Sequence, residues 1–138
     1  MLNKIFGEVQ WDTGWETETE ITLWGKKHKI TVAANAYYEH ELITGEQEKA
    51  YLAFKEIPTS RIEELLKQFY EELVWENFYV DKDDLIKGSP SEFLTPIELV
   101  IEQEGICALL FSDKNDLDNG IAVKLYPEEE VMTQDEFL

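Results

Sequence analysis

The sequence is poor in the residues that catalytic, metal and nucleic-acid sites use. Of its 138 residues, two are histidine, one is cysteine, and Arg61 is the one arginine. Cys107 has no partner for an internal disulfide and lies in an apolar stretch, so we expect a buried structural thiol. HExxH, paired cysteines, GxSxG and glycine-rich phosphate loops are all missing. We therefore predict no enzyme activity, no metal and no cofactor.

Long apolar runs are missing as well. The most apolar stretches, such as CALLF (107–111), have the length of a strand, so no membrane span is expected. The N-terminal MLNKIFGEVQWD lacks the basic and apolar regions of a secretion signal, which predicts a cytoplasmic protein. Hydrophobic residues make up 43% of the chain, enough for a core, and no repeat or linker divides it. We expect a single domain over residues 1–138.

Acidic residues are in large excess. Thirty Asp and Glu residues face twelve Lys and Arg residues, giving a formal net charge of −18. Nucleic acids and anionic membranes bind clustered basic residues, so both are disfavoured as partners. A small domain this acidic attracts cationic partners, although acidity can also serve solubility alone. Both interpretations stay open on composition.

The first part of the chain alternates between apolar and polar residues. This period of two predicts strands at 16–24 and 28–34, joined by a turn at 25–27. A shorter strand is expected at 4–11. The three strands would form a small antiparallel meander, with Ile30 among the residues that face the core.

Two helices are expected next. TGEQ (44–47) has the spacing of a capping box, and Pro58 should end the first helix at Ile57 or before. SRIE (60–63) repeats the capping-box spacing ahead of an amphipathic helix. The residues expected on the buried face of this second helix are Ile62, Leu65, Leu66, Phe69 and Leu73.

A polar loop over 77–93 should lead into three more strands, at 96–105, 105–111 and 120–126. The predicted fold class is α+β. It consists of an antiparallel sheet of about six strands in the order β-β-β-α-α-β-β-β, with two helices packed on one face.

The segment SDKNDLDNG (112–120) invites a comparison with calcium loops. In each possible EF-hand register, Leu117 occupies a position that needs an oxygen ligand, so we do not expect such a loop. Asn119-Gly120 is a preferred pair for a two-residue hairpin turn, which predicts a turn between two core strands. His40 in EHE (39–41) is expected to be a solvated loop residue rather than a metal ligand.

Two clusters combine aromatic and acidic side chains. WDTGW (11–15) places two tryptophans around a turn, and YEELVWENFYVDKDD (70–84) surrounds several aromatics with carboxylates. Such aromatics either close the edge of a core or anchor a protein interface. The candidate partner-binding residues are Trp11, Asp12, Trp15, Glu71, Glu72, Trp75, Glu76, Tyr79, Asp81, Asp83, Asp84, Asp116 and Asp118.

Several short segments follow a familiar pattern. They are IFGEV (5–9), LWGKKHKITV (23–32), LTPIELVI (94–101), NDLDNGIAVKL (115–125) and TQDEFL (133–138). Together they resemble small bacterial domains of unknown function, with relatives among the immunity proteins of contact-dependent growth inhibition and other polymorphic toxin systems. The resemblance implies no functional residues, because immunity interfaces vary with the toxin that they block.

The resulting hypothesis is a cytoplasmic immunity protein that binds and neutralises a cognate basic toxin domain, with a nuclease fitting the charge best. One alternative is an acidic binding or regulatory domain that has no toxin partner. Another is an enzyme that uses His40 or a pair of carboxylates, for which the sequence suggests no substrate.

Overall fold

The sheet is organised around a long hairpin of β4 (Gly14–Leu23) and β5 (Lys26–Asn35). The coordinates are a computed structural model that describes residues 1–76, 90–114 and 116–138, with the backbone alone for 73–76 and 116–119. Ile21 and Ile30 are buried, whereas Glu18 and Glu20 on the alternate positions are exposed. The predicted alternation in this hairpin is therefore confirmed.

The hairpin belongs to a seven-stranded sheet in the order β3-β4-β5-β6-β7-β8-β9. Neighbouring strands are antiparallel except β5 and β6, which run parallel with Thr31 opposite Glu98. A separate two-stranded sheet pairs β1 with β2. The remaining strands are β1 (Leu2–Asn3), β2 (Gly7–Glu8), β3 (Gln10–Trp11), β6 (Leu94–Ile101), β7 (Cys107–Asp113), β8 (Asp116–Tyr126) and β9 (Glu130–Thr133).

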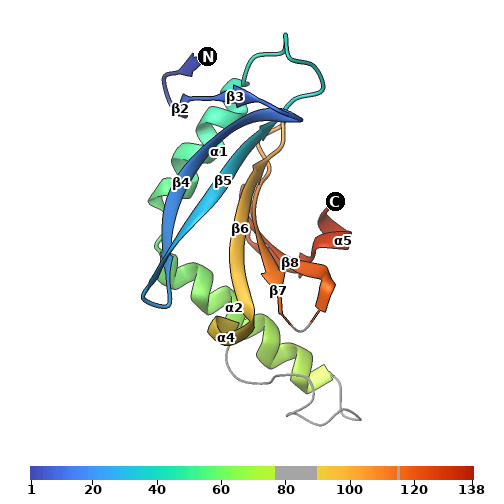
Figure 1. Cartoon of the computed structure of the whole chain (residues 1–138). Coiled ribbons are helices and arrows are strands. Elements are labelled where there is room, and N and C mark those ends of the chain that lie inside the picture. Colours follow the sequence, from blue (N-terminus) through green and yellow to red (C-terminus); the bar gives the residue numbers. More distant parts are fainter. Residues whose placement is uncertain (77–89, 115) are drawn as a thin grey trace.

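The described part of the chain contains four helices: α1 (Gly45–Glu56), α2 (Thr59–Glu76), α4 (Pro90–Phe93) and α5 (Gln134–Phe137). Both long helices lie on the same side of the sheet, and α5 lies on the other side (Figure 1). The helices α1 and α2 belong to the connection from β5 to β6. A connection of this length is what allows two strands to pair in parallel.

The main core lies between the sheet and the two long helices. Its largest fully buried side chains are Phe111, Leu23, Ile30, Ile62, Leu66, Leu99, Ile101 and Leu109. Cys107 is buried in this core, as expected, and burial raises the pKa of its thiol to about 12. A smaller cluster on the opposite face joins Val100, Leu110 and Ala122 to Met132 and Phe137. Thus α5 covers part of that second face.

The α+β class is confirmed, but the predicted count and order of strands are wrong. The expected strand at 4–11 is broken into pieces, and β9 and α5 follow the last predicted strand. The sheet also contains the parallel pair of β5 and β6. Alternation reveals which residues form a strand, but it carries no information about which strand becomes the neighbour.

The first helix begins as predicted. The Gln47 N–H donates to the Thr44 hydroxyl (3.1 Å), and the Gln47 side chain accepts from the Thr44 N–H (2.9 Å). The second predicted cap is wrong, because α2 already includes Thr59 and Ser60. The carboxylate of Glu63 instead accepts a hydrogen bond from the Trp24 N–H (2.8 Å).

The β4–β5 turn consists of Trp24 and Gly25, one residue earlier than expected. Both have positive φ, 49° and 78°, as a two-residue hairpin turn that follows the sheet twist requires. Glycine adopts this conformation freely, whereas tryptophan does so at a cost. The hydrogen bond from Trp24 to Glu63 holds the strained residue against α2.

The predicted turn at Asn119-Gly120 is also wrong. Both residues lie inside β8, and the hairpin turns between Asp113 and Asp116, which lie opposite each other. Gly120 is needed for close packing rather than for a turn. A Cβ there would overlap the Phe111 carbonyl oxygen and the Gln134 side chain, whose amide donates to that same carbonyl (2.8 Å).

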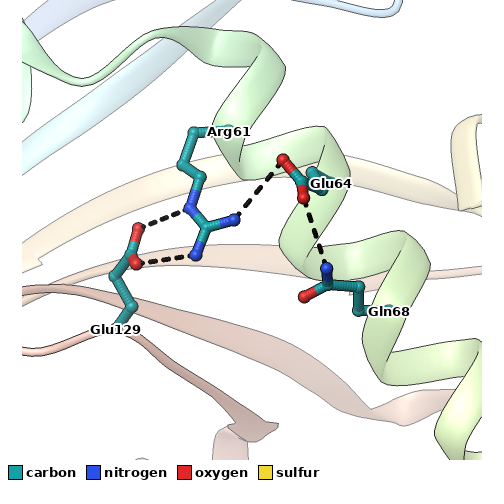
Figure 2. Close-up of polar contacts among 4 residues, drawn as sticks. All are labelled: Arg61, Glu64, Gln68 and Glu129. Carbon is teal, nitrogen blue, oxygen red and sulfur yellow. Dashed lines mark hydrogen bonds and ion pairs between the residues drawn. The ribbon is translucent and has the colours of Figure 1, made fainter.

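The one arginine ties α2 to the connection between β8 and β9. Arg61 donates two hydrogen bonds to the Glu129 carboxylate, at 3.1 and 2.9 Å, and forms an ion pair with Glu64 at 3.4 Å (Figure 2). Gln68 donates to the other oxygen of Glu64. Arg61 is therefore occupied by a structural contact.

No helix in the described residues is long and apolar enough to cross a membrane.

Candidate functional site

The first predicted cluster is divided between the surface and the core. Trp15 is only 7% exposed, so it belongs to the core and is no exposed anchor. Trp11 is half-buried and packs edge-on against Trp15, with ring centroids 5.3 Å apart. Asp12 is exposed at the turn between β3 and β4.

Trp11 and Asp12 border an open groove of about 690 Å³ on the β3 side of the sheet. Glu8, Glu16 and Glu18 line the same groove, but Glu8 pairs with the N-terminal amine and Glu18 pairs with Lys29. Burial, and then the nearby Asp12 carboxylate, raise the pKa of Glu16. The groove is acidic and wide, and it is too open to surround a small ligand on several sides.

The second predicted cluster is described only in part. Glu71 and Glu72 are exposed on α2, near the end of the molecule opposite β3 (Figure 1). The structure therefore does not bring these two glutamates near Trp11 and Asp12. Tyr79, Asp81, Asp83 and Asp84 lie outside the described residues, as do the side chains of Trp75, Glu76, Asp116 and Asp118.

Among the described residues, the most exposed aromatic side chains lie on the connection between β5 and α1. We call residues 36–43 the tyrosine loop. Tyr37 is 81% exposed, Tyr38 is 63% exposed and Leu42 is 69% exposed. His40 is exposed beside them, and its ring stacks on Tyr38 with centroids 5.4 Å apart. Exposed large apolar groups gathered on one segment are typical of binding surfaces.

A single carboxylate holds the shape of this loop. One oxygen of Glu41 accepts from the N–H groups of Tyr37 (3.0 Å) and Tyr38 (2.9 Å). Its other oxygen accepts from the Gln103 side chain (3.2 Å). These hydrogen bonds, led by the one from Gln103, lower the pKa of Glu41. Because a charged acceptor bonds more strongly than a neutral one, the ionised form orders the loop.

The base of the loop is fixed to the sheet by buried polar contacts. The Trp15 indole N–H donates to the Glu41 carbonyl (2.7 Å). Gln47, which is 1% exposed, donates to the carbonyls of Asn35 (2.8 Å) and Ile101 (3.0 Å). The loop is therefore bonded at both ends and along its length, and its tyrosines are held outward rather than free to collapse.

Acidic residues lie next to the tyrosine loop. A hollow of about 430 Å³ is lined by Tyr37, Glu102, Gln103 and Glu104, among others. Burial raises the pKa of Glu102, and its hydrogen bond and charge repulsion with Glu104 raise it further. A cation placed in this hollow would relieve that repulsion. Loop and hollow together offer aromatic contact area beside negative charge, which suits a basic protein surface.

The tyrosine loop was not among the predicted binding residues, although the sequence contains a signal for it. AYYEHEL (36–42) follows a strand, precedes a capping box and has neither strand nor helix period. Two adjacent tyrosines in a segment without a buried face have no core to enter. His40 is exposed in the structure, as expected for a loop residue. Among the described residues, no group of three His, Cys, Asp or Glu side chains could hold a metal ion.

The comparisons with known proteins identify a family without a function. Residues 5–105 match the model of a domain of unknown function, DUF6985. No curated protein and no solved structure matches the chain. The matched segment contains the β4–β5 hairpin and the tyrosine loop, whereas β7, β8 and β9 lie beyond it. The chain is thus a member of the DUF6985 family of domains of unknown function.

Proposed function

We propose that this protein is an immunity protein, which binds a basic toxin domain and blocks its active site. The observation that carries the proposal is the tyrosine loop, which presents Tyr37, Tyr38 and Leu42 in a fixed shape on a chain with a net charge of −18. Tyrosines that are already ordered give contact area at a small cost in conformational entropy. The surrounding carboxylates attract a positively charged site and speed the encounter.

The toxin that fits this surface best is a nuclease. Its active site must bind phosphates and is therefore basic. In the proposed complex the tyrosine loop enters that site, while Glu102 and Glu104 lie opposite lysines or arginines that would otherwise hold nucleic acid. Inhibition is then a matter of occlusion, and no chemical step is required of the immunity protein.

Co-expression tests the proposal directly. The proposal expects a toxin gene directly upstream, encoding a large secreted protein, and the C-terminal domain of that protein is the toxin to test. Expressed alone in a bacterial host, that domain should stop growth, and co-expression of this chain should restore growth. The two proteins should co-purify in equal amounts, and their affinity should fall as salt is raised. If the domain is toxic and this chain neither binds it nor restores growth, the proposal is wrong.

A matched pair of leucines tests the role of the loop. Leu42→Ala removes an exposed side chain from the tyrosine loop, whereas Leu52→Ala removes one from the outer surface of α1. We expect Leu42→Ala to weaken toxin binding by about tenfold if it is an anchor and Leu52→Ala to leave the affinity unchanged. Equal effects of the two variants would place the interface elsewhere.

A further inference from the structure

The backbone of β4 is left without a neighbour along most of one side. β3 pairs with β4 only at Trp15 and Glu16. Among the described residues, no other strand lies on that side, so residues 17–23 form an open sheet edge. In Figure 1, β3 lies beside only the upper end of β4. From there to the hairpin turn, β4 has β5 on one side and no strand on the other.

The hairpin register shows which backbone groups face outward. Leu23 and Lys26 flank a two-residue turn, so they exchange both backbone hydrogen bonds. Along an antiparallel pair, residues that bond to the neighbouring strand alternate with residues that do not. Counting back from Leu23, the N–H and C=O groups of Glu18, Glu20 and Thr22 therefore point away from β5. The Gly14 carbonyl, at an equivalent even position, also points away, because it accepts from the Asp12 N–H (3.0 Å). Three consecutive donor and acceptor pairs are therefore available for another strand.

A groove runs beside this edge on the helix side of the sheet. It measures about 300 Å³ and lies between β4 at Thr19–Thr22 and the helices α1 and α2. Its lining includes the apolar side chains of Ile21, Tyr51, Phe54, Ile57 and Ile62. A strand added to the edge would send every second side chain into this groove.

The other face of the edge is acidic. Glu16, Glu18 and Glu20 alternate with the residues that face the helices. Glu18 and Glu20 form exposed ion pairs with Lys29 (3.1 Å) and Lys27 (3.9 Å) on β5. Exposed pairs of this kind are weak, so both glutamates can accept a second cation from the open side.

We propose that the open edge of β4 binds an extended segment in which apolar and basic residues alternate, by adding it to the sheet as a further strand. Its apolar side chains enter the groove against Ile21 and Phe54. Its lysines or arginines lie beside Glu18 and Glu20 on the other face. The three outward backbone pairs supply the hydrogen bonds that fix its register.

The same glutamates argue against a second copy of this chain as the occupant. If two β4 edges paired antiparallel, glutamates of one copy would face glutamates of the other, and like charges directly opposite destabilise a sheet. The edge therefore favours a basic strand over itself. This inference does not depend on toxin inhibition, because the edge and the tyrosine loop are separate parts of the surface.

The experiment uses the full chain and a short synthetic peptide in which lysine and valine alternate. We expect saturable binding by calorimetry. Amide hydrogen exchange, read by NMR, should show new protection at Glu18, Glu20 and Thr22. The amides of Thr17, Thr19 and Ile21 already bond to β5 and should change little. A peptide that does not bind, or that binds without protecting these three amides, would overturn the proposal.

Backbone methylation separates strand pairing from simple charge attraction. One peptide carries N-methyl groups on its lysine amides and another carries them on its valine amides, with side chains and charge unchanged. In strand pairing only one set of amides faces β4, so one of the two peptides should bind about tenfold more weakly or worse. The weakened peptide reveals the strand direction. Equal affinity of both methylated peptides and the parent would refute strand addition.

A matched pair of glutamates checks the acidic face. Glu20→Gln and Glu72→Gln each remove one negative charge from an exposed position. Since a cross-strand charge pair is a local contact, Glu20→Gln should weaken peptide binding by about twofold to fivefold, and Glu72→Gln should have a smaller effect. Equal losses would mean that only the net charge attracts the peptide.

Discussion

The tyrosine loop and the open edge of β4 are both exposed and both acidic, but they offer opposite kinds of contact. In the loop, the backbone N–H groups of Tyr37 and Tyr38 are already bonded to Glu41, and their side chains are exposed. At the edge, the outward backbone groups of Glu18 and Glu20 have no strand beside them in the described part of the chain, and Lys29 and Lys27 already contact the side chains. A loop of this kind selects a partner by shape, whereas an edge selects any extended segment with suitable alternation.

The largest expected effect is a loss of stability, caused by a substitution at the base of the tyrosine loop and away from the open edge. Gln47→Ala removes the side-chain donor to the carbonyls of Asn35 and Ile101 and half of the capping box. We expect a loss of about 2–4 kcal/mol in the free energy of unfolding, measured with urea. Gln68→Ala removes an exposed glutamine that bonds Glu64 on the helix surface and should cost less than about 0.5 kcal/mol.

The same variant sharpens the comparison between the two surfaces. Folded Gln47→Ala protein should bind the toxin more weakly, because its loop is less ordered, yet it should bind the alternating peptide as the natural chain does. Parallel losses in both affinities would mean that loop and edge are not independent.

A smaller effect is expected at the hairpin that ends the edge. Glu63→Ala removes the acceptor that holds the Trp24 N–H against α2. We expect about 1 kcal/mol of destabilisation by urea unfolding. Glu64→Ala, which removes a carboxylate from exposed contacts with Arg61 and Gln68, is the control and should cost less. Equal costs would show that the Trp24 contact contributes little.

The smallest expected effects are pH dependences of stability, which have opposite signs for Glu41 and Glu98. The pKa of Glu41 is lowered, so its contribution to stability is complete above the unfolded value near 4.5 and is lost as pH falls through the lowered pKa. Loop order, followed by the NMR signals of the Tyr37 and Tyr38 amides, should therefore persist at neutral pH and disappear in acid.

On the outer face of the sheet, burial and then the charge of Glu16 raise the pKa of Glu98. The ionised form is disfavoured in the folded state, so its cost is absent below about pH 4.5, grows between that value and the raised pKa, and is complete above the raised pKa. Glu98→Gln should raise the melting temperature slightly at pH 7 and not at pH 4. Glu128→Gln removes the same charge from an exposed position and serves as control. A gain that is equal at both pH values would contradict the assignment.

Local patterns predicted much of the fold. Alternation located the β4–β5 hairpin, and the Thr44–Gln47 spacing located the start of α1. The TQDE segment (133–136) has the same capping spacing, with Thr133 and Glu136, and in the structure it caps α5, a helix that was not predicted. These features depend on residues a few positions apart, so the sequence alone contains them.

The candidate surfaces were predicted less well, because exposure is set by distant contacts. Nothing near Trp15 in the sequence indicates that its indole will bond the carbonyl of Glu41. Asn119-Gly120 has the sequence of a turn, but the approach of Gln134 and the Phe111 carbonyl makes it part of a strand. The local preference of Asn-Gly for a turn contributes less free energy than the packing of Gly120 inside the sheet.

By itself the sequence determined the charge, the α+β class, the long hairpin and the cap of α1, since each follows from composition or from short-range patterns. Only the tertiary structure decided that β5 and β6 run parallel, that β3 stops after pairing with Trp15 and Glu16, and that Glu41 fixes two exposed tyrosines. The physical reason is that strand neighbours and long-range hydrogen bonds arise from packing of the whole chain, on which local pattern places few constraints.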